Sequence, residues 1–410
     1  MQRRDFLSSS LIAGCGLAGS LTSSNQSASA AEPDSGDAPK EKRLLFGHPV
    51  VSGPAPESLT ILQGVNGPAS GFVELAIGDQ DFQRIDGERA GLLPYDANVL
   101  KFVLPPLPAG ETIRYRVVAR PIQFNSAYKI VQGEPEQTDT IEFQTLNPHA
   151  SSTRFIIWND THENVATIRQ LQQLTQAFDP DFLLWNGDQT NDVYAPVKMR
   201  GQYLSPGELE ICAQWPMAYA RGNHDVRGPA ARLVSQFTGT PNDQFYYAFR
   251  SGPVAALVMD TGEDKPDDRE VFAGLAGFAA MRERQRKWLE EVIQQDWFRA
   301  APYRLLFCHI PLWWESDGKE RDFWMCSEVC RELWLPLLEK GRVQLVVSGH
   351  THQSQFLPRS QSQSIPQLIG GGPQQERATI IEGIADEEKL TIRCKSLTGE
   401  IRHEVEIRAT

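Results

Sequence analysis

Five short stretches of this chain carry residue types that commonly bind metal ions. They combine aspartate, asparagine and histidine, and they contain five of the eight histidines. A mixed set of carboxylate, amide and imidazole ligands suits zinc, manganese or iron. In chain order, the stretches are Asp160-Thr161-His162, Gly187-Asp188, Gly222-Asn223-His224-Asp225, Cys308-His309 and Gly349-His350-Thr351-His352.

The spacing of these residues indicates two metal ions. Two cations roughly 3.5–4 Å apart need a shared ligand that offsets their repulsion, and a carboxylate can provide it. We assign this bridging role to Asp188, which follows an apolar run and a tight turn. Asp160 and His162 can point at one ion, whereas His350 and His352 can be divided between the two. A hydroxide held between the ions would be a nucleophile near neutral pH, and the cations would stabilise a phosphoryl group under in-line attack.

Most of these stretches follow an apolar run that we expect to form a buried strand. Such runs end at Trp158, Trp185, Phe307 and Val347, and helical spacing is seen over 164–178, 281–295 and 328–340. This alternation predicts an α/β domain with a largely buried sheet. Open α/β sheets bind ligands at the carboxyl ends of their strands, so residues far apart in the chain can meet there. Further strands are expected over 254–259, 378–384, 389–395 and 401–408.

Residues 44 to 148 show a different pattern. Short β-rich runs, such as 71–77 and 113–118, are separated by proline- and glycine-rich turns. This pattern predicts a small β-sandwich. Nothing in it looks catalytic.

The N-terminus reads as a targeting segment. Arg3-Arg4-Asp5-Phe6-Leu7 is a twin-arginine start, and Ala28-Ser29-Ala30 has the form of a cleavage site. We predict a twin-arginine signal peptide over 1–30 and a linker over 31–43. The expected partner is the twin-arginine export machinery, and the expected location is periplasmic or extracellular.

A second interpretation of the same segment is a lipoprotein. Ile12-Ala13-Gly14-Cys15 resembles a lipoprotein cleavage box. Cys15 would then carry a lipid anchor and hold the protein at a membrane. We rank this second because the apolar stretch before Cys15 is short.

Charge and cysteine content exclude some classes of function. The net charge of −12 disfavours a nucleic acid polymer as a partner, although a local cation site can still bind a small phosphorylated substrate. No C-x-x-C zinc pattern is present, and the cysteines beyond the signal are too sparse for a disulfide scaffold. We expect these cysteines to be small buried hydrophobes: Cys212, Cys308, Cys326, Cys330 and Cys394.

The ordered motifs resemble those of the calcineurin-like metallophosphoesterase superfamily, over about Thr153 to Phe356. Its pattern is D-x-H, G-D, G-N-H-D/E, x-H and G-H-x-H. The resemblance implies that His224 is not a ligand but a general acid beside the leaving-group oxygen, which Asp225 orients and charges. It also implies two metal sites, the first formed by Asp160, His162, Asp188 and His352, and the second by Asp188, Asn223, His309 and His350.

The β-sandwich and Ala220-Arg221 before Gly222 further resemble bacterial relatives of purple acid phosphatases. The implied fold is a four-layer α/β/β/α metallophosphoesterase domain over 149–410, preceded by a fibronectin-III-like β-sandwich over 44–148. Two positions depart from purple acid phosphatases. His162 stands where they carry glycine, and Asn191 where they carry the tyrosine that binds ferric iron. The two divalent ions are therefore expected to be manganese, iron or zinc.

Three further features have two interpretations each. Arg221 could contact phosphate or be a structural salt-bridge partner. Asn191 or Asp192 could line the site or cap a helix. The aromatic segment from Trp313 to Trp324 could be a substrate loop or could pack in the core.

Together these observations predict an exported dinuclear metal-dependent phosphoesterase that hydrolyses small phosphomonoesters. A metal-bridging hydroxide would attack phosphorus, the ions and Arg221 would stabilise the transition state, and His224 would protonate the departing alkoxide. One alternative is a phosphodiesterase or nucleotide hydrolase that uses the same site. The other is a non-catalytic exported metal-binding module.

Overall fold

The computed structural model describes residues 43 to 409, apart from residues 56, 58 and 315 to 324. The predicted signal peptide, Cys15 and the predicted linker up to residue 42 lie outside the described residues. Within the described part of the chain, no helix has both the length and the apolar character that a bilayer crossing requires.

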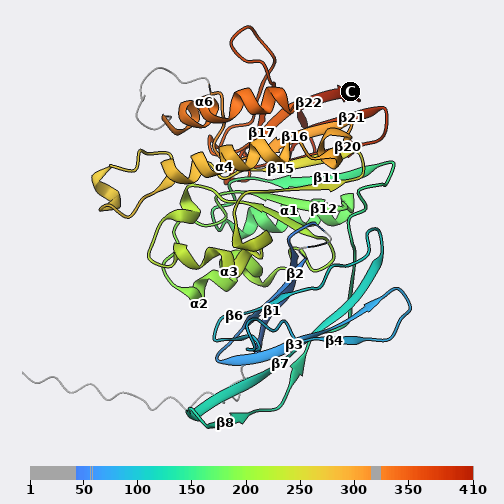
Figure 1. The fold of residues 1–410 in the computed structure, drawn as a ribbon, viewed down its shortest axis with the longest axis vertical. Coiled ribbons are helices and arrows are strands. Elements are labelled where there is room, and N and C mark those ends of the chain that lie inside the picture. The colour runs from blue at the N-terminus through green and yellow to red at the C-terminus, as the bar shows by residue number, and fades with distance from the viewer. Residues whose placement is uncertain (1–42, 56, 58, 315–324, 410) are drawn as a thin grey trace, which may run out of the picture. The chain divides into compact units, whose positions relative to one another are not determined.

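A nine-stranded sheet carries the first three metal-ligand motifs (Figure 1). Its centre is a parallel set of β11 (Thr153–Trp158), β12 (Phe182–Asn186) and β13 (Met217–Ala220). Antiparallel strands follow beside β11: β20 (Thr379–Ala385), β21 (Lys389–Ser396) and β22 (Ile401–Arg408). The predicted strands are confirmed to within a few residues. β13 was not predicted, because four residues are too few for a clear pattern.

A six-stranded sheet carries the last two motifs. Three of its strands, β15 (Val254–Val258), β16 (Tyr303–Phe307) and β17 (Leu345–Ser348), run parallel to one another. β19 (Gln367–Ile369) continues this parallel set, while β14 (Tyr247–Ser251) and β18 (Gln355–Leu357) form antiparallel edges.

Successive side chains of a strand point to opposite faces of the sheet, and this alternation shows how the two sheets and the helices stack. Phe155 and Ile157 of β11 share a hydrophobic cluster with Phe307 of β16, so this cluster lies between the sheets. Ile156 and Trp158 point the other way, toward Ile168 and Leu171 of α1 (Val165–Phe178).

The six-stranded sheet has the same arrangement on its own outer face. Leu306 and Val346 pack there against Leu289 of α4 (Phe278–Val292) and Trp334 of α6 (Met325–Lys340). The order of layers is therefore helix, sheet, sheet, helix. Short helices fill the connections: α2 (Pro196–Met199), α3 (Val234–Thr238) and α5 (Asp296–Arg299).

The N-terminal strands divide between two sheets. β1 (Leu45–Ser52), β2 (Thr60–Val65) and β6 (Val99–Val103) extend the nine-stranded sheet, because Ser52 of β1 pairs with Met217 of β13. The others form a separate sheet, built on β3 (Ala69–Ile77), β4 (Gln83–Ile85), β7 (Thr112–Ser126) and β10 (Ile141–Gln144), with the short strands β5 (Tyr95–Asp96), β8 (Lys129–Gln132) and β9 (Glu136–Gln137).

One hydrophobic cluster connects these N-terminal strands. It contains Ile61 and Phe102 from the nine-stranded sheet and Val73 and Tyr115 from the separate sheet. Because β1 pairs with β13, the nine-stranded sheet contains strands from both sides of the predicted boundary between residues 148 and 149.

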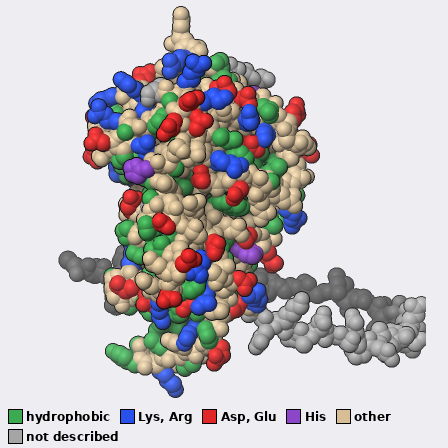
Figure 2. Space-filling view, turned by 90° about the vertical axis from the view of Figure 1, so that its right-hand side faces the viewer, with side chains coloured by type: hydrophobic (Ala, Val, Ile, Leu, Met, Phe, Trp, Pro, Cys, Tyr) green, Lys and Arg blue, Asp and Glu red, His purple; other side chains and the backbone are tan. Residues whose placement is uncertain are grey.

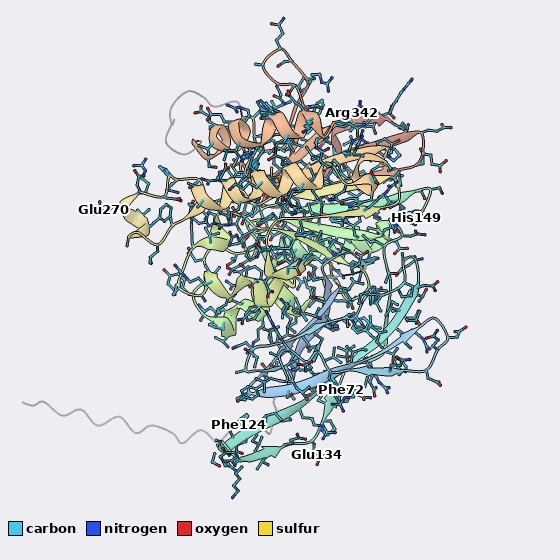
Figure 3. The ribbon with its side chains drawn as sticks, in the orientation of Figure 1. Phe72, Phe124, Glu134, His149, Glu270 and Arg342 are labelled. Atoms are coloured by element: carbon cyan, nitrogen blue, oxygen red, sulfur yellow. The ribbon has the colours of Figure 1, made fainter. Side chains whose placement is uncertain are left out.

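Many charged side chains lie on the surface (Figure 2), and the described cysteines lie in the interior. Acidic and basic side chains are interspersed on the face that Figure 2 shows. Figure 3 labels Phe124 near the end of β7 and Glu270 in the segment between β15 and α4. The prediction for the cysteines is confirmed, since all five described cysteines are buried and free.

Candidate metal centre

The fold brings the predicted ligands together at the carboxyl ends of neighbouring strands. Asp160, Asp188 and Asn223 follow β11, β12 and β13 of the nine-stranded sheet. His309 and His350 follow β16 and β17 of the six-stranded sheet. The site therefore forms where the loops of two sheets meet.

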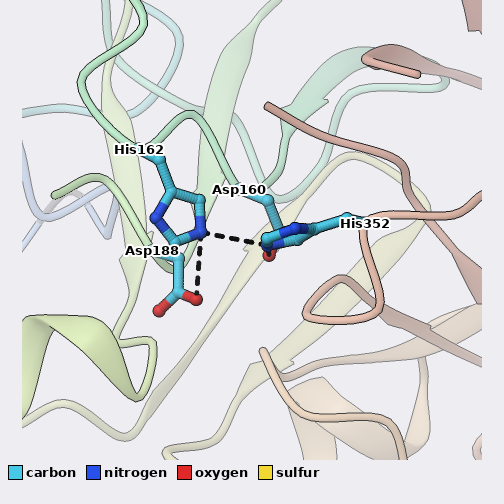
Figure 4. Close-up of side chains that lie close together, drawn as sticks. All are labelled: Asp160, His162, Asp188 and His352. Carbon is cyan, nitrogen blue, oxygen red and sulfur yellow. Dashed lines mark hydrogen bonds and ion pairs between the residues drawn. The ribbon is translucent and has the colours of Figure 1, made fainter. Parts of the chain in front are cut away.

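Four of the ligands make a first group. The ligand atoms of Asp160, His162, Asp188 and His352 all lie within 4.8 Å of one another. His162 Nε2 lies 3.0 Å from His352 Nε2 and 3.5 Å from Asp188 Oδ2 (Figure 4). His352 Nε2 is 3.6 Å from Asp160 Oδ1. Two imidazole nitrogens that converge beside two carboxylates are arranged as donors around a cation.

A second group contains Asp188, His309 and His350, and it meets the same distance limit. His309 Nε2 lies 3.0 Å from Asp188 Oδ2. The other ring nitrogen, Nδ1, is 2.9 Å from the carbonyl oxygen of Asn186. Because a carbonyl only accepts, Nδ1 donates its proton to Asn186, and this hydrogen bond directs Nε2 toward Asp188 and the site. Asp188 belongs to both groups, which is the position that a bridging ligand requires.

The chemistry of these residues fits divalent cations. Burial and the neighbouring charge of Asp188 raise the pKa of Asp160 to about 7, against the opposing effect of His309. Burial lowers the pKa of His309, but the charges of Asp188 and Asp160 outweigh it and raise that pKa to about 10. Among the described residues, the buried Asn223 Oδ1 has no hydrogen-bond partner. Buried carboxylates and an unpaired amide oxygen are the features that a bound cation would satisfy.

The backbone is strained at these ligands. Five of them have a positive φ, which is uncommon for residues other than glycine. Such strain costs about 1–3 kcal/mol per residue and clusters at functional sites. The residues and angles are Asp160 (47°), His162 (43°), Asp188 (51°), His350 (70°) and His352 (56°).

The motif glycines allow the loops to approach one another closely. A Cβ at Gly222 would lie 2.2 Å from Asp188 Oδ1, and a Cβ at Gly349 would lie 2.3 Å from Asp160 Oδ2. Any larger residue at these positions would displace a carboxylate of the site.

Asn191 connects two histidines of the site. Its side-chain Oδ1 lies 3.1 Å from His162 Nδ1, and its backbone oxygen lies 2.8 Å from His224 Nδ1. Glu163 holds this loop by accepting a hydrogen bond from the backbone N–H of Asn191 at 3.1 Å. Of the two interpretations for Asn191, the structure therefore supports lining the site. The backbone oxygen of Asp192 accepts hydrogen bonds from Thr190 and Gln202, and the residue is exposed.

His224 lies beside the predicted ligands, and its hydrogen bonds define its tautomer. Its backbone N–H donates to Asp188 Oδ1 at 2.9 Å, and its ring centroid is 4.7 Å from that of His162. Nδ1 faces the carbonyl oxygen of Asn191, which only accepts, while Nε2 is 2.9 Å from Nη1 of Arg227, which only donates. In this arrangement His224 is a neutral imidazole with its proton on Nδ1.

Asp225 does not orient His224 in the way the resemblance implied. Its Oδ2 accepts hydrogen bonds from the backbone N–H groups of Asp188 (3.0 Å) and Gly222 (2.9 Å), and its Oδ1 accepts one from Tyr203 (3.1 Å). Consecutive residues of the 3₁₀ turn His224–Val226 point in different directions, which separates the two side chains. Asp225 instead joins the backbone at Asp188 to the backbone at Gly222.

The structure supports the second interpretation of Arg221, that of a structural salt-bridge partner. Its Nη2 forms an ion pair with the buried Asp260, and its guanidinium stacks 4.2 Å from the ring centre of Phe245. The side chain of Arg221 is only 14% exposed. The structure therefore makes Arg221 a salt-bridge partner.

The sequence prediction missed Arg227. Its Nε and Nη2 donate to Glu263 at 2.9 and 2.7 Å, and its Nη1 reaches His224. The only clue was its place three residues after His224, a spacing that brings side chains together in a helical turn.

The predicted aromatic segment falls partly outside the described residues, which stop at Trp314 and resume at Met325. Trp313 is buried, and Gln367 accepts hydrogen bonds from the backbone N–H groups of Leu312 and Trp313. Trp313 therefore packs in the core.

Comparison with known proteins agrees with this geometry. Residues 153–354 match the family model for calcineurin-like phosphoesterases. The serine/threonine-protein phosphatase CPPED1 of Mus musculus is 24% identical over 171 residues, which cover 42% of this chain and 48% of that protein. The probable purple acid phosphatase 20 of Arabidopsis thaliana is 22% identical over 250 residues, 58% of this chain and 53% of that protein.

Among solved structures, the purple acid phosphatase PPD1 from yellow lupin seeds has a similar fold. The TM-score is 0.64 at 15% identity, and the match covers 88% of this chain and 74% of that one. This likeness concerns the fold alone. The chain spans about half the length of the curated relatives it matches.

Proposed function

Residues 153–354 form a calcineurin-like phosphoesterase domain, and from this premise we propose that the chain is a dinuclear metal-dependent phosphatase acting on small phosphomonoesters. The observation that carries the proposal is that Asp188 belongs to both ligand groups. The first ion would be held by Asp160, His162, Asp188 and His352, and the second by Asp188, Asn223, His309 and His350.

The protein's own residues then have defined roles. Divalent ions, when bound, lower the pKa of water and offset charge on a phosphoryl group. Asp225 holds the backbone around Asp188, and Asn191 holds His162 and His224 in place. This support keeps the ligand atoms converged, which lowers the cost of organising the site during reaction.

We place His224 on the side of the leaving group. To protonate the departing oxygen, its Nε2 must carry a proton. The hydrogen bond that this nitrogen accepts from Arg227 therefore has to open during turnover. The water consumed in hydrolysis supplies the proton that the alcohol product retains.

The proposal also covers the residues that precede the phosphoesterase domain in the chain. Residues 44–148 would be a fibronectin-III-like β-sandwich module with no catalytic part. Residues 1–30 would direct export by the twin-arginine machinery to the periplasm or beyond, with a lipid anchor at Cys15 as the alternative. Export in a folded state would suit a protein that takes up its metals in the cytoplasm.

The proposal is tested by comparing two substrates. Manganese-loaded protein lacking residues 1–30 is assayed with p-nitrophenyl phosphate and with bis(p-nitrophenyl) phosphate. The proposal predicts a much higher kcat/KM for the monoester. A preference for the diester would replace it with a phosphodiesterase, and turnover of neither ester with two metals bound would favour a binding module.

A further inference from the structure

Two arginines flank the Gly222–Asp225 motif, and they are held differently. Arg221 is committed to Asp260, and its guanidinium is covered by Phe245. Arg227 is held by Glu263 on one edge of its guanidinium, while Nη1 points to His224. The Arg227 side chain is 26% exposed, against 14% for Arg221. Arg227 is therefore the arginine that a ligand in the site can reach.

Glu263 fixes the position of this guanidinium. Its side chain is 1% exposed, and its two oxygens accept separate hydrogen bonds from Nε and Nη2. Such a fork-shaped pair sets the direction of the whole planar group. The segment that carries Glu263 is held in turn by Arg282 of α4, which donates to the backbone oxygens of Thr261 and Glu263.

The other edge of the Arg227 guanidinium, at Nη1, is directed to His224 beside the candidate metal centre. Nη1 lies 2.9 Å from His224 Nε2, and the backbone N–H of His224 is bonded to Asp188. Burial lowers the pKa of Arg227, but the hydrogen bond and charge of Glu263, with smaller contributions from Asp264 and Asp188, outweigh it and hold that pKa above its ordinary value. Nη1 carries two N–H groups, and only one is needed for the bond to His224. The second can donate to an anion.

We propose that Arg227, oriented by Glu263, contacts the phosphoryl group of the substrate and makes the site prefer phosphomonoesters to phosphodiesters. A monoester has three terminal oxygens and a charge near −2 at neutral pH, whereas a diester has two terminal oxygens and a charge of −1. A permanently charged guanidinium gains more from the first than from the second. The inference rests on the proposed function and names the residue that would set its substrate class.

The test compares Arg227→Met with Arg232→Met, which removes the same charge from an exposed position five residues further along the chain. Loss of charged hydrogen bonds should lower kcat/KM for p-nitrophenyl phosphate by about 30-fold. For bis(p-nitrophenyl) phosphate, the change should stay below about threefold. Arg232→Met should behave like the wild type with both esters. Equal losses on the two esters in Arg227→Met would overturn the inference.

Binding of inorganic phosphate, measured by calorimetry on manganese-loaded protein, gives a readout that does not need turnover. The Kd should rise by about tenfold or more in Arg227→Met, with metal content unchanged. An unchanged Kd would contradict the contact. Wild-type protein that binds phosphate through Arg227 but hydrolyses neither ester would overturn the proposed function and leave the contact standing.

Two further variants separate contact from folding. Arg227→Lys keeps the charge but loses the paired hydrogen bonds to Glu263. This variant should retain part of the monoester preference. In Arg227→Ala, added guanidinium ion should restore part of the lost monoester activity, because the small cation can occupy the position beside Glu263. No rescue together with an unchanged monoester-to-diester ratio would assign Arg227 a structural role only.

Discussion

The two sheets contribute different residue types to the candidate metal centre. Loops of the nine-stranded sheet carry all the oxygen ligands of the proposed set, namely Asp160, Asp188 and Asn223, together with His162. Loops of the six-stranded sheet supply only imidazoles, and these come from His309, His350 and His352. Carboxylates are thus concentrated on one layer, and imidazoles on the other would complete the coordination. Neither sheet carries a complete site, so the packing of the two layers is itself part of the centre.

The largest expected effect comes from the carboxylate shared by both ligand groups. Asp188→Asn removes the charge that offsets two cations, so both ions should bind weakly and activity should fall by at least about 10³-fold. Metal content and kcat/KM on p-nitrophenyl phosphate are the measurements. Asp139→Asn, on the exposed surface of residues 44–148, is the matched control and should resemble the wild type. If Asp188→Asn still binds two ions tightly, Asp188 is not the bridging ligand.

Replacing one imidazole from the six-stranded sheet should do less. His309→Gln keeps most of the side-chain volume but loses a donor of the second ligand group only. We expect one ion per chain to remain and activity to fall by about 100-fold. Metal analysis after gel filtration measures the remaining ion. Loss of both ions would mean that the two groups do not behave as separate sites.

A smaller effect is expected for a residue that holds ligands without binding metal. Asn191→Ala removes the side-chain partner of His162 Nδ1. Loss of such a partner typically weakens metal binding by about 10-fold or more. Manganese titration should show this weakening in the site that contains His162, while the other site keeps its affinity. Equal weakening of both sites would contradict the assignment.

The smallest effect concerns an ion pair that also joins the two layers. Arg227 follows β13, and Glu263 follows β15. Burial raises the pKa of Glu263, but hydrogen bonding to Arg227 outweighs it and lowers that pKa to about 2. Because folding lowers the pKa of Glu263, its ionised carboxylate stabilises the fold at pH values above its ordinary pKa near 4.5. This contribution to stability is lost as the pH falls toward 2.

In metal-free protein, Glu263→Gln should therefore be less stable than the wild type by about 2 kcal/mol at pH 7. The difference should shrink as the pH is lowered from about 4.5 toward 2. Thermal unfolding of both proteins across this range measures it. A difference that stays constant from pH 7 to pH 3 would show that the ionised pair is not its source.

The sequence predicted the residues that lie on regular elements and left out those that depend on contacts between loops. Apolar runs ending in Asp160, Asp188, His309 and His350 are local patterns, and the structure places them as expected. Arg227 belongs to no pattern, because its role depends on Glu263, 36 residues away in the chain. For the same reason, the sequence alone could not separate the two interpretations of Arg221 or of Asn191.

Asp225 shows a different limit of prediction from sequence. Its neighbour His224 suggested a pair, but adjacent residues of a 3₁₀ turn diverge, and the carboxylate bonds to backbone N–H groups instead. Spacing in sequence indicates which residues share a loop. It does not fix the direction in which each side chain points.

The most direct test of the account is electron paramagnetic resonance of the protein titrated with manganese. If Asp188 bridges two ions held between the two sheets, two Mn²⁺ should bind per chain and the final spectrum should show two spin-coupled ions. Asp188→Asn should lose the coupled signal. A wild-type protein that binds a single ion, or two ions whose spectra are independent, would contradict the shared carboxylate on which the proposed function depends.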